Sequence, residues 1–295
     1  MSLLSRPPRP ASGTFPPPVS LIDLKHPEIV QELPDGHQAG AWLLRADAPD
    51  TEVTRVAVLA QGWRGGPMET LAQAIIEADP GTVAVVLAQP RINIPGDPRQ
   101  FKKFVNEVGY ASVGRRRMET VSSIGRYVAK EFNLEAIDLY GHSLGGVDVA
   151  NTAANTGRGF EISNMTLLAS AGQLTSLREA AGVVRRVNSS HCPNVPARKS
   201  DRRNLPQIAT EGANALFQRI GLKLINAADD GISVAGIGFE NDRTFPVVDG
   251  IIPAGIAPAR YTVLRGGDTC HRMPSHPEEA PRIVAAARQL HSVSA

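Results

Sequence analysis

The run GTVAVVLAQP, at residues 81–90, constrains the fold of this chain more than any other segment. Every residue from Val83 to Ala88 is apolar, so the run lacks the alternation of a strand with one face in water. A continuous run of this kind is typical of a strand buried on both faces of a parallel sheet. The sequence therefore predicts a parallel sheet that is covered by helices on both faces.

Strand-like and helix-like segments alternate along the rest of the chain. Two apolar runs, 28–33 and 37–47, flank a Pro34-Asp35-Gly36 turn, which favours a β-hairpin. Further strands are expected at 54–62, 136–143, 162–171, 231–240 and 261–267. Helices are expected at 68–80, 115–133, 144–155 and 277–290. The predicted fold class is α/β, with a doubly wound, mostly parallel sheet and a leading β-hairpin.

The chain of 295 residues is long enough for one sizeable core, and the pattern predicts a single α/β domain over 21–295. Residues 1–20 are rich in proline and are expected to be extended or disordered. Residues 174–230 lie between two core strands and have little sheet character, so we expect a lid or cap insertion there. A second excursion, 91–112, is expected to help shape a pocket.

Composition excludes several classes of function. With 31 basic and 29 acidic side chains, the net charge of +2 argues against general nucleic-acid binding. No run approaches the ~18 apolar residues of a membrane span, and the N-terminus lacks a signal-peptide core, so a cytoplasmic protein is expected. The chain has no zinc-type Cys/His spacing, Walker A sequence or dinucleotide fingerprint, so we expect no metal and no cofactor. Its two cysteines, Cys192 and Cys270, allow one disulfide or two thiols. Oligomeric state is not indicated.

The segment Gly141-His142-Ser143-Leu144-Gly145-Gly146 lies between a predicted strand and a predicted helix. A serine on a sharp strand-to-helix turn has a strained backbone and presents its Oγ at the positive end of the helix. There the Leu144 N–H can meet an oxyanion. The alternative is an ordinary glycine-rich turn in which Ser143 caps the helix. The strand–turn–helix context favours Ser143 as a nucleophile.

This motif resembles the nucleophile elbow of the α/β-hydrolase family of serine hydrolases, the esterases and lipases among them, and the resemblance extends over about residues 28–290. It implies a catalytic triad in the order nucleophile, acid, histidine, with the last two on loops after late strands. The acid that matches is Asp242, in GFENDRTFP directly after the strand at 231–240. It would accept a hydrogen bond from histidine Nδ1 and stabilise the imidazolium. The competing acids are Glu240, Asp229, Asp230 and Asp268.

The histidine that matches this order is His271, in LRGGDTCHRMP after the last predicted strand. It would act as the general base. His142, inside the elbow, should point away from Ser143 Oγ if it follows the alternation of the strand. The other histidines are His26, His37, His191, His276 and His291.

The run Gln61-Gly62-Trp63-Arg64-Gly65-Gly66 is similar to the His-Gly-x-x-Gly segment of the family, which supplies an oxyanion-hole donor. Gln61 stands where the family commonly has histidine, but a backbone donor needs no particular side chain. The resemblance thus implies the Trp63 N–H and the Leu144 N–H as the two donors.

Together these residues predict a serine hydrolase that cleaves a small-molecule carboxylic ester through an acyl-enzyme on Ser143. Thioesterase, amidase, acyltransferase or cofactor-free haloperoxidase-like activity would use the same residues, and a non-catalytic binding protein is the alternative from another class. Dehalogenase and epoxide-hydrolase chemistry is disfavoured, because those relatives have Asp at the nucleophile position. Residues 178–203 hold seven basic and two acidic side chains. This basic excess indicates a solvated lid or, less strongly, an anionic substrate or membrane surface; no firm membrane signal is present.

Overall fold

The computed structural model describes residues 28–46, 52–62, 68–88, 110–170, 220–242, 245, 247, 252–253, 255–267 and 269–293. The N-terminal segment 1–20, most of the excursion 91–112 and the basic stretch 178–203 lie outside these residues. Only the last part of the expected lid, from residue 220, is described.

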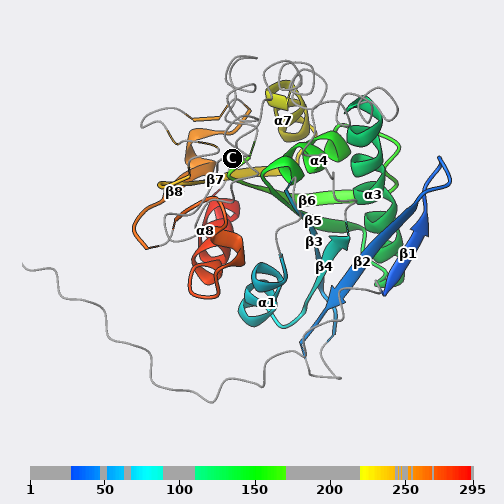
Figure 1. Cartoon of the computed structure of the whole chain (residues 1–295), viewed down its shortest axis with the longest axis horizontal. Coiled ribbons are helices and arrows are strands. Elements are labelled where there is room, and N and C mark those ends of the chain that lie inside the picture. Colours follow the sequence, from blue (N-terminus) through cyan, green and yellow to red (C-terminus); the bar gives the residue numbers. More distant parts are fainter. Residues whose placement is uncertain are drawn as a thin grey trace, which may run out of the picture.

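The described residues form an eight-stranded sheet in the order β1-β2-β4-β3-β5-β6-β7-β8 (Figure 1). Its strands are β1 (Ile29–Glu32), β2 (Gln38–Leu44), β3 (Arg55–Ala60), β4 (Thr82–Ala88), β5 (Ala136–His142), β6 (Glu161–Leu168), β7 (Ser233–Phe239) and β8 (Tyr261–Leu264). β2 is antiparallel to β1 and to β4, whereas all the other neighbours are parallel. The predicted α/β class, mostly parallel sheet and leading hairpin are confirmed.

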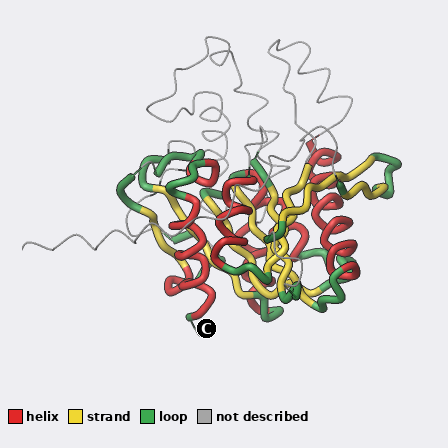
Figure 2. The backbone as a smooth tube through the Cα atoms, turned by 90° about the horizontal axis from the view of Figure 1, so that it is seen from below, coloured by secondary structure: helices red, strands yellow, loops and turns green. Residues whose placement is uncertain are grey.

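Helices cover both faces of this sheet (Figures 1 and 2). They are α1 (Glu69–Ala78), α3 (Tyr110–Glu131), α4 (Leu144–Ala153), α7 (Ile220–Asp229) and α8 (Ala280–Ser292). α1 packs against α8 on one face, and α4 packs between α3 and α7 on the other. The sheet therefore separates two hydrophobic clusters, one under each helix layer.

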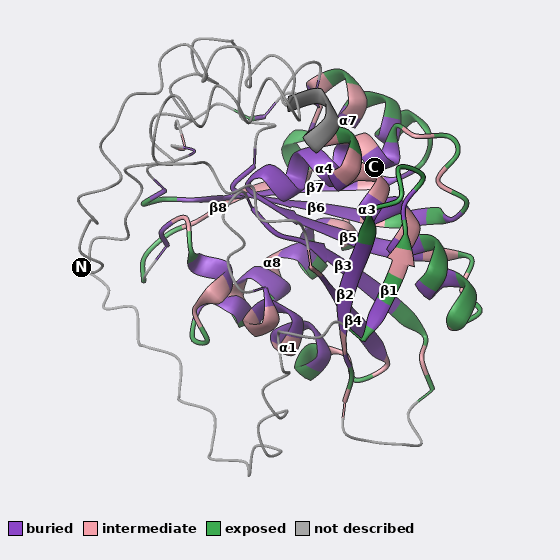
Figure 3. Ribbon diagram, turned by 45° about the vertical axis from the view of Figure 1, so that its right-hand side comes forward, coloured by how far each residue is buried: buried purple, intermediate pink, exposed green. Residues whose placement is uncertain are grey.

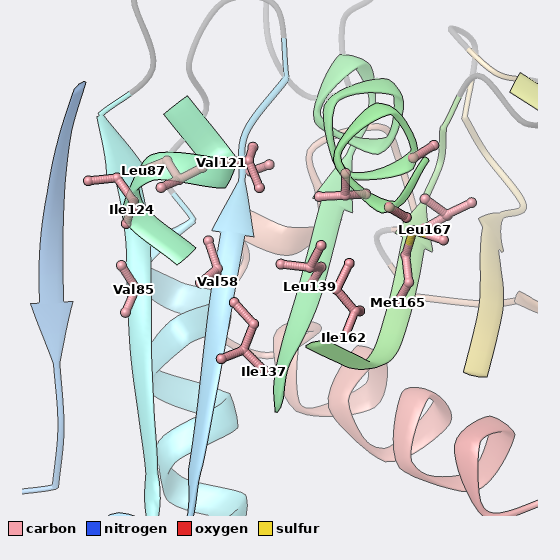
Figure 4. Close-up of a cluster of buried hydrophobic side chains, with 14 of the residues drawn as sticks. Val58, Val85, Leu87, Val121, Ile124, Ile137, Leu139, Ile162, Met165 and Leu167 are labelled. Atoms are coloured by element: carbon pink, nitrogen blue, oxygen red, sulfur yellow. The ribbon is translucent and has the colours of Figure 1, made fainter. Parts of the chain in front are cut away.

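Burial explains the apolar sequence of the central strands. Val83, Val85 and Leu87 of β4 point into the cluster under α3, and their neighbours Ala84 and Val86 point into the cluster under α1. Figure 4 shows Val85 and Leu87 beside Val121 and Ile124, which belong to α3. Figure 3 shows the strands in the middle of the sheet as almost wholly buried. Both faces of β4 are thus apolar because both are covered.

The structure differs from the sequence prediction at two helices. α3 begins at Tyr110, five residues before the expected start at residue 115. More importantly, α7 occupies the last part of the region expected to be a lid, 174–230. Its buried residues Ile220, Leu224 and Ala227 recur with helical spacing and pack against α4 and β7, so α7 belongs to the core layer. The prediction missed this helix because the polar residues before it dominated the segment.

Candidate active site

Ser143 stands at the turn between β5 and α4, at the carboxyl end of the parallel strands. Its φ of 56° and ψ of −119° lie in a region that side-chain-bearing residues rarely adopt. Its N–H donates to Leu168 O at the end of β6, 2.9 Å away, which holds the turn in place. Ser143 makes no side-chain capping hydrogen bond to the helix. The geometry is that of a strained elbow rather than of a helix cap.

Two glycines lie where the backbone approaches this turn closely. A Cβ on Gly145 would lie 2.0 Å from Ala60 O, because the first turn of α4 packs directly on the end of β3. A Cβ on Gly62 would lie 3.0 Å from Ser143 Cβ and 3.3 Å from Ser143 Oγ. The backbone that follows β3 thus passes immediately beside the serine side chain.

Leu144 is the first residue of α4 and is buried. At this position the backbone N–H has no carbonyl partner within the helix, and the helix dipole adds positive potential. Leu144 N–H is therefore suited to stabilise a negative charge next to Ser143. Trp63, which the sequence predicts as the second donor, lies outside the described residues.

His271 and Asp242 meet on the loops that follow β8 and β7. His271 Nδ1 lies 2.7 Å from Asp242 Oδ2, and the Asp242 side chain is completely buried. The other carboxylate oxygen, Asp242 Oδ1, accepts the Phe245 N–H at 3.0 Å, which fixes the orientation of the carboxylate. This is the contact expected of an acid that sets the tautomer of a catalytic histidine.

A second pair of residues joins the two loops. Asn241 N–H donates to Thr269 O at 3.1 Å, and Asn241 Nδ2 donates to Thr269 Oγ1 at 2.9 Å. Asn241 precedes Asp242 by one residue, and Thr269 precedes His271 by two. These hydrogen bonds hold the loop that carries Asp242 next to the loop that carries His271.

The competing acids are placed elsewhere or not described. Glu240 accepts hydrogen bonds from Arg265 Nη1 and from Gly266 N–H, at 3.2 and 2.9 Å. Asp229 ends α7 and Asp230 follows it; both precede β7, so they lie at the opposite end of the strands from Asp242. Asp268 is outside the described residues.

His142 contributes to the site in a way that sequence reasoning missed. Its Nε2 lies 2.7 Å from the backbone oxygen of His271, and the two rings are 4.7 Å apart between centroids. Burial, and then the neighbouring His271, hold the pKa of His142 well below its usual value. His142 is therefore neutral and, because a carbonyl can only accept, carries its proton on Nε2. It supports the backbone of His271, a contact across 129 residues that no sequence pattern indicates.

Next to His271, Cys270 is disulfide-bonded, and the only other cysteine of the chain, Cys192, lies outside the described residues. Within the described part of the chain, no group of three or more His, Cys, Asp or Glu side chains is suited to hold a metal ion. Among the described helices, none is both long and apolar enough to cross a membrane.

Several solved structures share this arrangement of strands and helices. An esterase from Exiguobacterium antarcticum matches with a TM-score of 0.55 at 14% identity, over 88% of this chain and 98% of that one. Est1E from Butyrivibrio proteoclasticus matches with a TM-score of 0.54 at 14% identity, over 86% and 95%. A bromoperoxidase from Bacillus anthracis matches with a TM-score of 0.51 at 13% identity, over 87% and 98%.

At such low identities the likeness establishes the fold, and the chain has the α/β-hydrolase fold. No model of a known protein family matches the sequence, and no curated protein does. Fold alone does not determine activity, so the function has to be argued from the site.

Proposed function

We propose that this protein is a serine hydrolase that cleaves a carboxylic ester of a small molecule, with Ser143, Asp242 and His271 as its catalytic triad. The observation that carries the proposal is the buried 2.7 Å contact between Asp242 Oδ2 and His271 Nδ1, at the same end of the sheet as the strained Ser143 turn. The order of the three residues along the chain is that of the fold.

In the proposed mechanism, His271 Nε2 takes the proton of Ser143 Oγ as the oxygen attacks the ester carbonyl. The resulting oxyanion is stabilised by the Leu144 N–H and, as the second donor, the Trp63 N–H. His271 then gives the proton to the departing alcohol, which leaves an acyl group on Ser143. A water molecule, deprotonated by His271, hydrolyses this acyl-enzyme and restores the serine.

Asp242 has a defined task in this scheme. Because its carboxylate contacts Nδ1, it keeps a proton there and leaves Nε2 to accept the proton of Ser143 Oγ. It also stabilises the imidazolium that forms when His271 holds the serine proton. No cofactor and no metal ion enters any step.

Covalent labelling tests the nucleophile. We expect a fluorophosphonate to form a stable adduct with the purified protein, and peptide mass spectrometry to locate it on Ser143. The control is Ser143→Ala, which loses only a hydroxyl and should remain folded but unlabelled. An adduct on another serine, or no adduct on a folded wild-type protein, contradicts the proposal.

A second set of experiments tests which bond is cleaved and which acyl group is preferred. Ester, thioester and amide substrates with the same acyl group distinguish the reaction classes, and p-nitrophenyl esters of increasing acyl length measure the preference for the acid portion. We expect the oxygen ester to have the largest kcat/KM. Labelling of Ser143 without turnover of any of these substrates would favour acyl transfer or halide-dependent peracid chemistry, whereas a protein that neither labels nor turns over substrate would be a binding protein.

A further inference from the structure

A buried ion pair lies behind the candidate active site. Arg117 of α3 and Asp148 of α4 are each about 1% exposed. Arg117 Nε lies 3.1 and 2.9 Å from the two carboxylate oxygens of Asp148, and Arg117 Nη2 lies 2.6 Å from Oδ2. Two guanidinium nitrogens thus bind this carboxylate, and both are closest to Oδ2.

The same guanidinium makes one more contact. Arg117 Nη2 donates to the backbone oxygen of Gln61 at 2.7 Å, directly after β3. The Gln61 side chain is held as well, since its Nε2 donates to Leu87 O at 2.6 Å. Because a peptide unit is planar, fixing the Gln61 carbonyl also fixes the direction of the Gly62 N–H.

These contacts connect the two backbone segments that border Ser143. Asp148 belongs to α4, whose first residue is Leu144, and Gly62 lies against the Ser143 side chain. Arg117 holds α4 through the Asp148 carboxylate and holds the Gln61–Gly62 segment through a carbonyl. Arg117 thus adds a link between α4 and this segment to the direct packing of Gly145 on Ala60 O.

Stability alone does not account for such a pair. Desolvating two charges costs about as much as their attraction returns, and apolar replacements of buried ion pairs are often neutral or stabilising. An oxyanion site, in contrast, needs its donors within a few tenths of an ångström of the productive position.

We propose that Arg117, itself held by Asp148, is a positioning residue that fixes the Gln61–Gly62 segment relative to the N-terminus of α4 and so shapes the oxyanion site. This inference rests on the proposed function, because it concerns the transition state of the Ser143 reaction. Neither side chain touches the substrate.

The decisive variant is Arg117→Met combined with Asp148→Leu, which removes both charges of the pair. We expect kcat, per site titrated with a fluorophosphonate, to fall about 10- to 100-fold while KM stays within about twofold. A boronic acid that mimics the tetrahedral intermediate should lose affinity by the same factor as kcat/KM. A purely structural role would lower the titrated fraction and the melting temperature but leave kcat per site unchanged.

The matched control is Asp138→Asn, which changes a buried carboxylate near the other end of β5, where it accepts a hydrogen bond from Asn164. Its kcat per titrated site should equal that of the wild type. If the double variant does not fold, Arg117→Lys decides by the same criterion, since lysine keeps the charge but lacks the planar fork. A folded variant with kcat within twofold of the wild type overturns the inference, whereas an inactive, unlabelled wild type overturns the proposed function instead.

Discussion

Each end of the parallel strands holds a partly buried histidine, and the two differ in the groups that contact the ring. At the carboxyl end, His271 Nδ1 contacts the buried carboxylate of Asp242. At the amino end, His291 of α8 contacts two hydroxyls, with Nδ1 2.8 Å from Ser233 Oγ and Nε2 2.8 Å from Thr166 Oγ1. We refer to Thr166, Ser233, Arg260 and His291 as the His291 cluster.

The charged groups near the two histidines differ in sign. Burial, and then the nearby Arg260 and Arg55, lower the pKa of His291 to about 4. Arg260 also donates a hydrogen bond to Ser233 Oγ. The charged form of His291 is therefore disfavoured, whereas the group that contacts His271 Nδ1 is a carboxylate.

The two serines at these ends also have different surroundings. Ser233 opens a regular strand and contacts Nδ1 of a histidine whose protonation is opposed by arginines. Ser143 stands on a strained turn before a helix N-terminus, at the end of the sheet where the histidine has a carboxylate partner. The carboxylate and the elbow distinguish the two ends.

The largest expected effect compares the two serines. Ser143→Ala should lower kcat for a p-nitrophenyl ester by about 10⁶-fold, because it removes the attacking oxygen. Ser233→Ala removes a hydroxyl of the same kind from the His291 cluster and should leave kcat within about twofold. Steady-state kinetics of the two variants, each checked by circular dichroism, measure the difference. Equal losses of kcat in the two variants would contradict the assignment of Ser143 as the nucleophile.

The second prediction concerns the carboxylate that distinguishes the two histidines. Asp242→Asn should lower kcat by about 10⁴-fold, because an amide on Nδ1 favours the wrong tautomer and cannot stabilise the imidazolium. Asp268→Asn should have a much milder effect. Measuring kcat for both variants at the same pH tests the assignment. The reverse ranking would identify Asp268 as the acid.

Periodicity explains why most of the fold was predictable. The β4 run is apolar on both faces, and α8 has an apolar stripe. Each of these elements can therefore be predicted from its own residues, without knowing what packs against it. The helix α7 was not predicted, although Ile220, Leu224 and Ala227 have helical spacing. It is only ten residues long and follows a long segment with many polar residues, which hid its pattern. The choice of Asp242 after β7 and of His271 after β8 came from the resemblance to the α/β-hydrolase family, whose acid and histidine stand on loops after late strands.

Contacts between distant elements were not predictable in the same way. Arg117 lies four residues before Val121 and seven before Ile124, so it stands on the apolar stripe of α3, where an arginine requires a buried partner. That position signals burial but does not identify Asp148 or the Gln61 carbonyl as partners. His142 gave no such signal, because its contact with His271 O depends on how the last loop folds back over β5.

The smallest expected effect concerns stability at the His291 cluster. In the unfolded chain His291 takes up a proton near its ordinary pKa of 6.5, whereas in the folded protein it does so only near pH 4. The free energy of unfolding should therefore fall as the pH is lowered from 7 to 5, since the unfolded state binds the extra proton, and His291 should account for about 2 kcal/mol of this fall. Its contribution should level off below about pH 4.

The variant His291→Gln isolates this contribution, because glutamine keeps hydrogen-bonding atoms but does not titrate in this range. Urea unfolding at pH 7, 6 and 5 should show a shallower loss of stability for the variant than for the wild type. Buried His142, whose folded pKa is also lowered, acts with the same sign and remains in both proteins, so it cancels in the difference. At pH 7 the kcat of the variant should match that of the wild type, because His291 lies at the other end of the strands from Ser143. Parallel stability curves for the two proteins would show that His291 takes up its proton equally readily in the folded and unfolded chains, which would remove the electrostatic contrast between the two histidines.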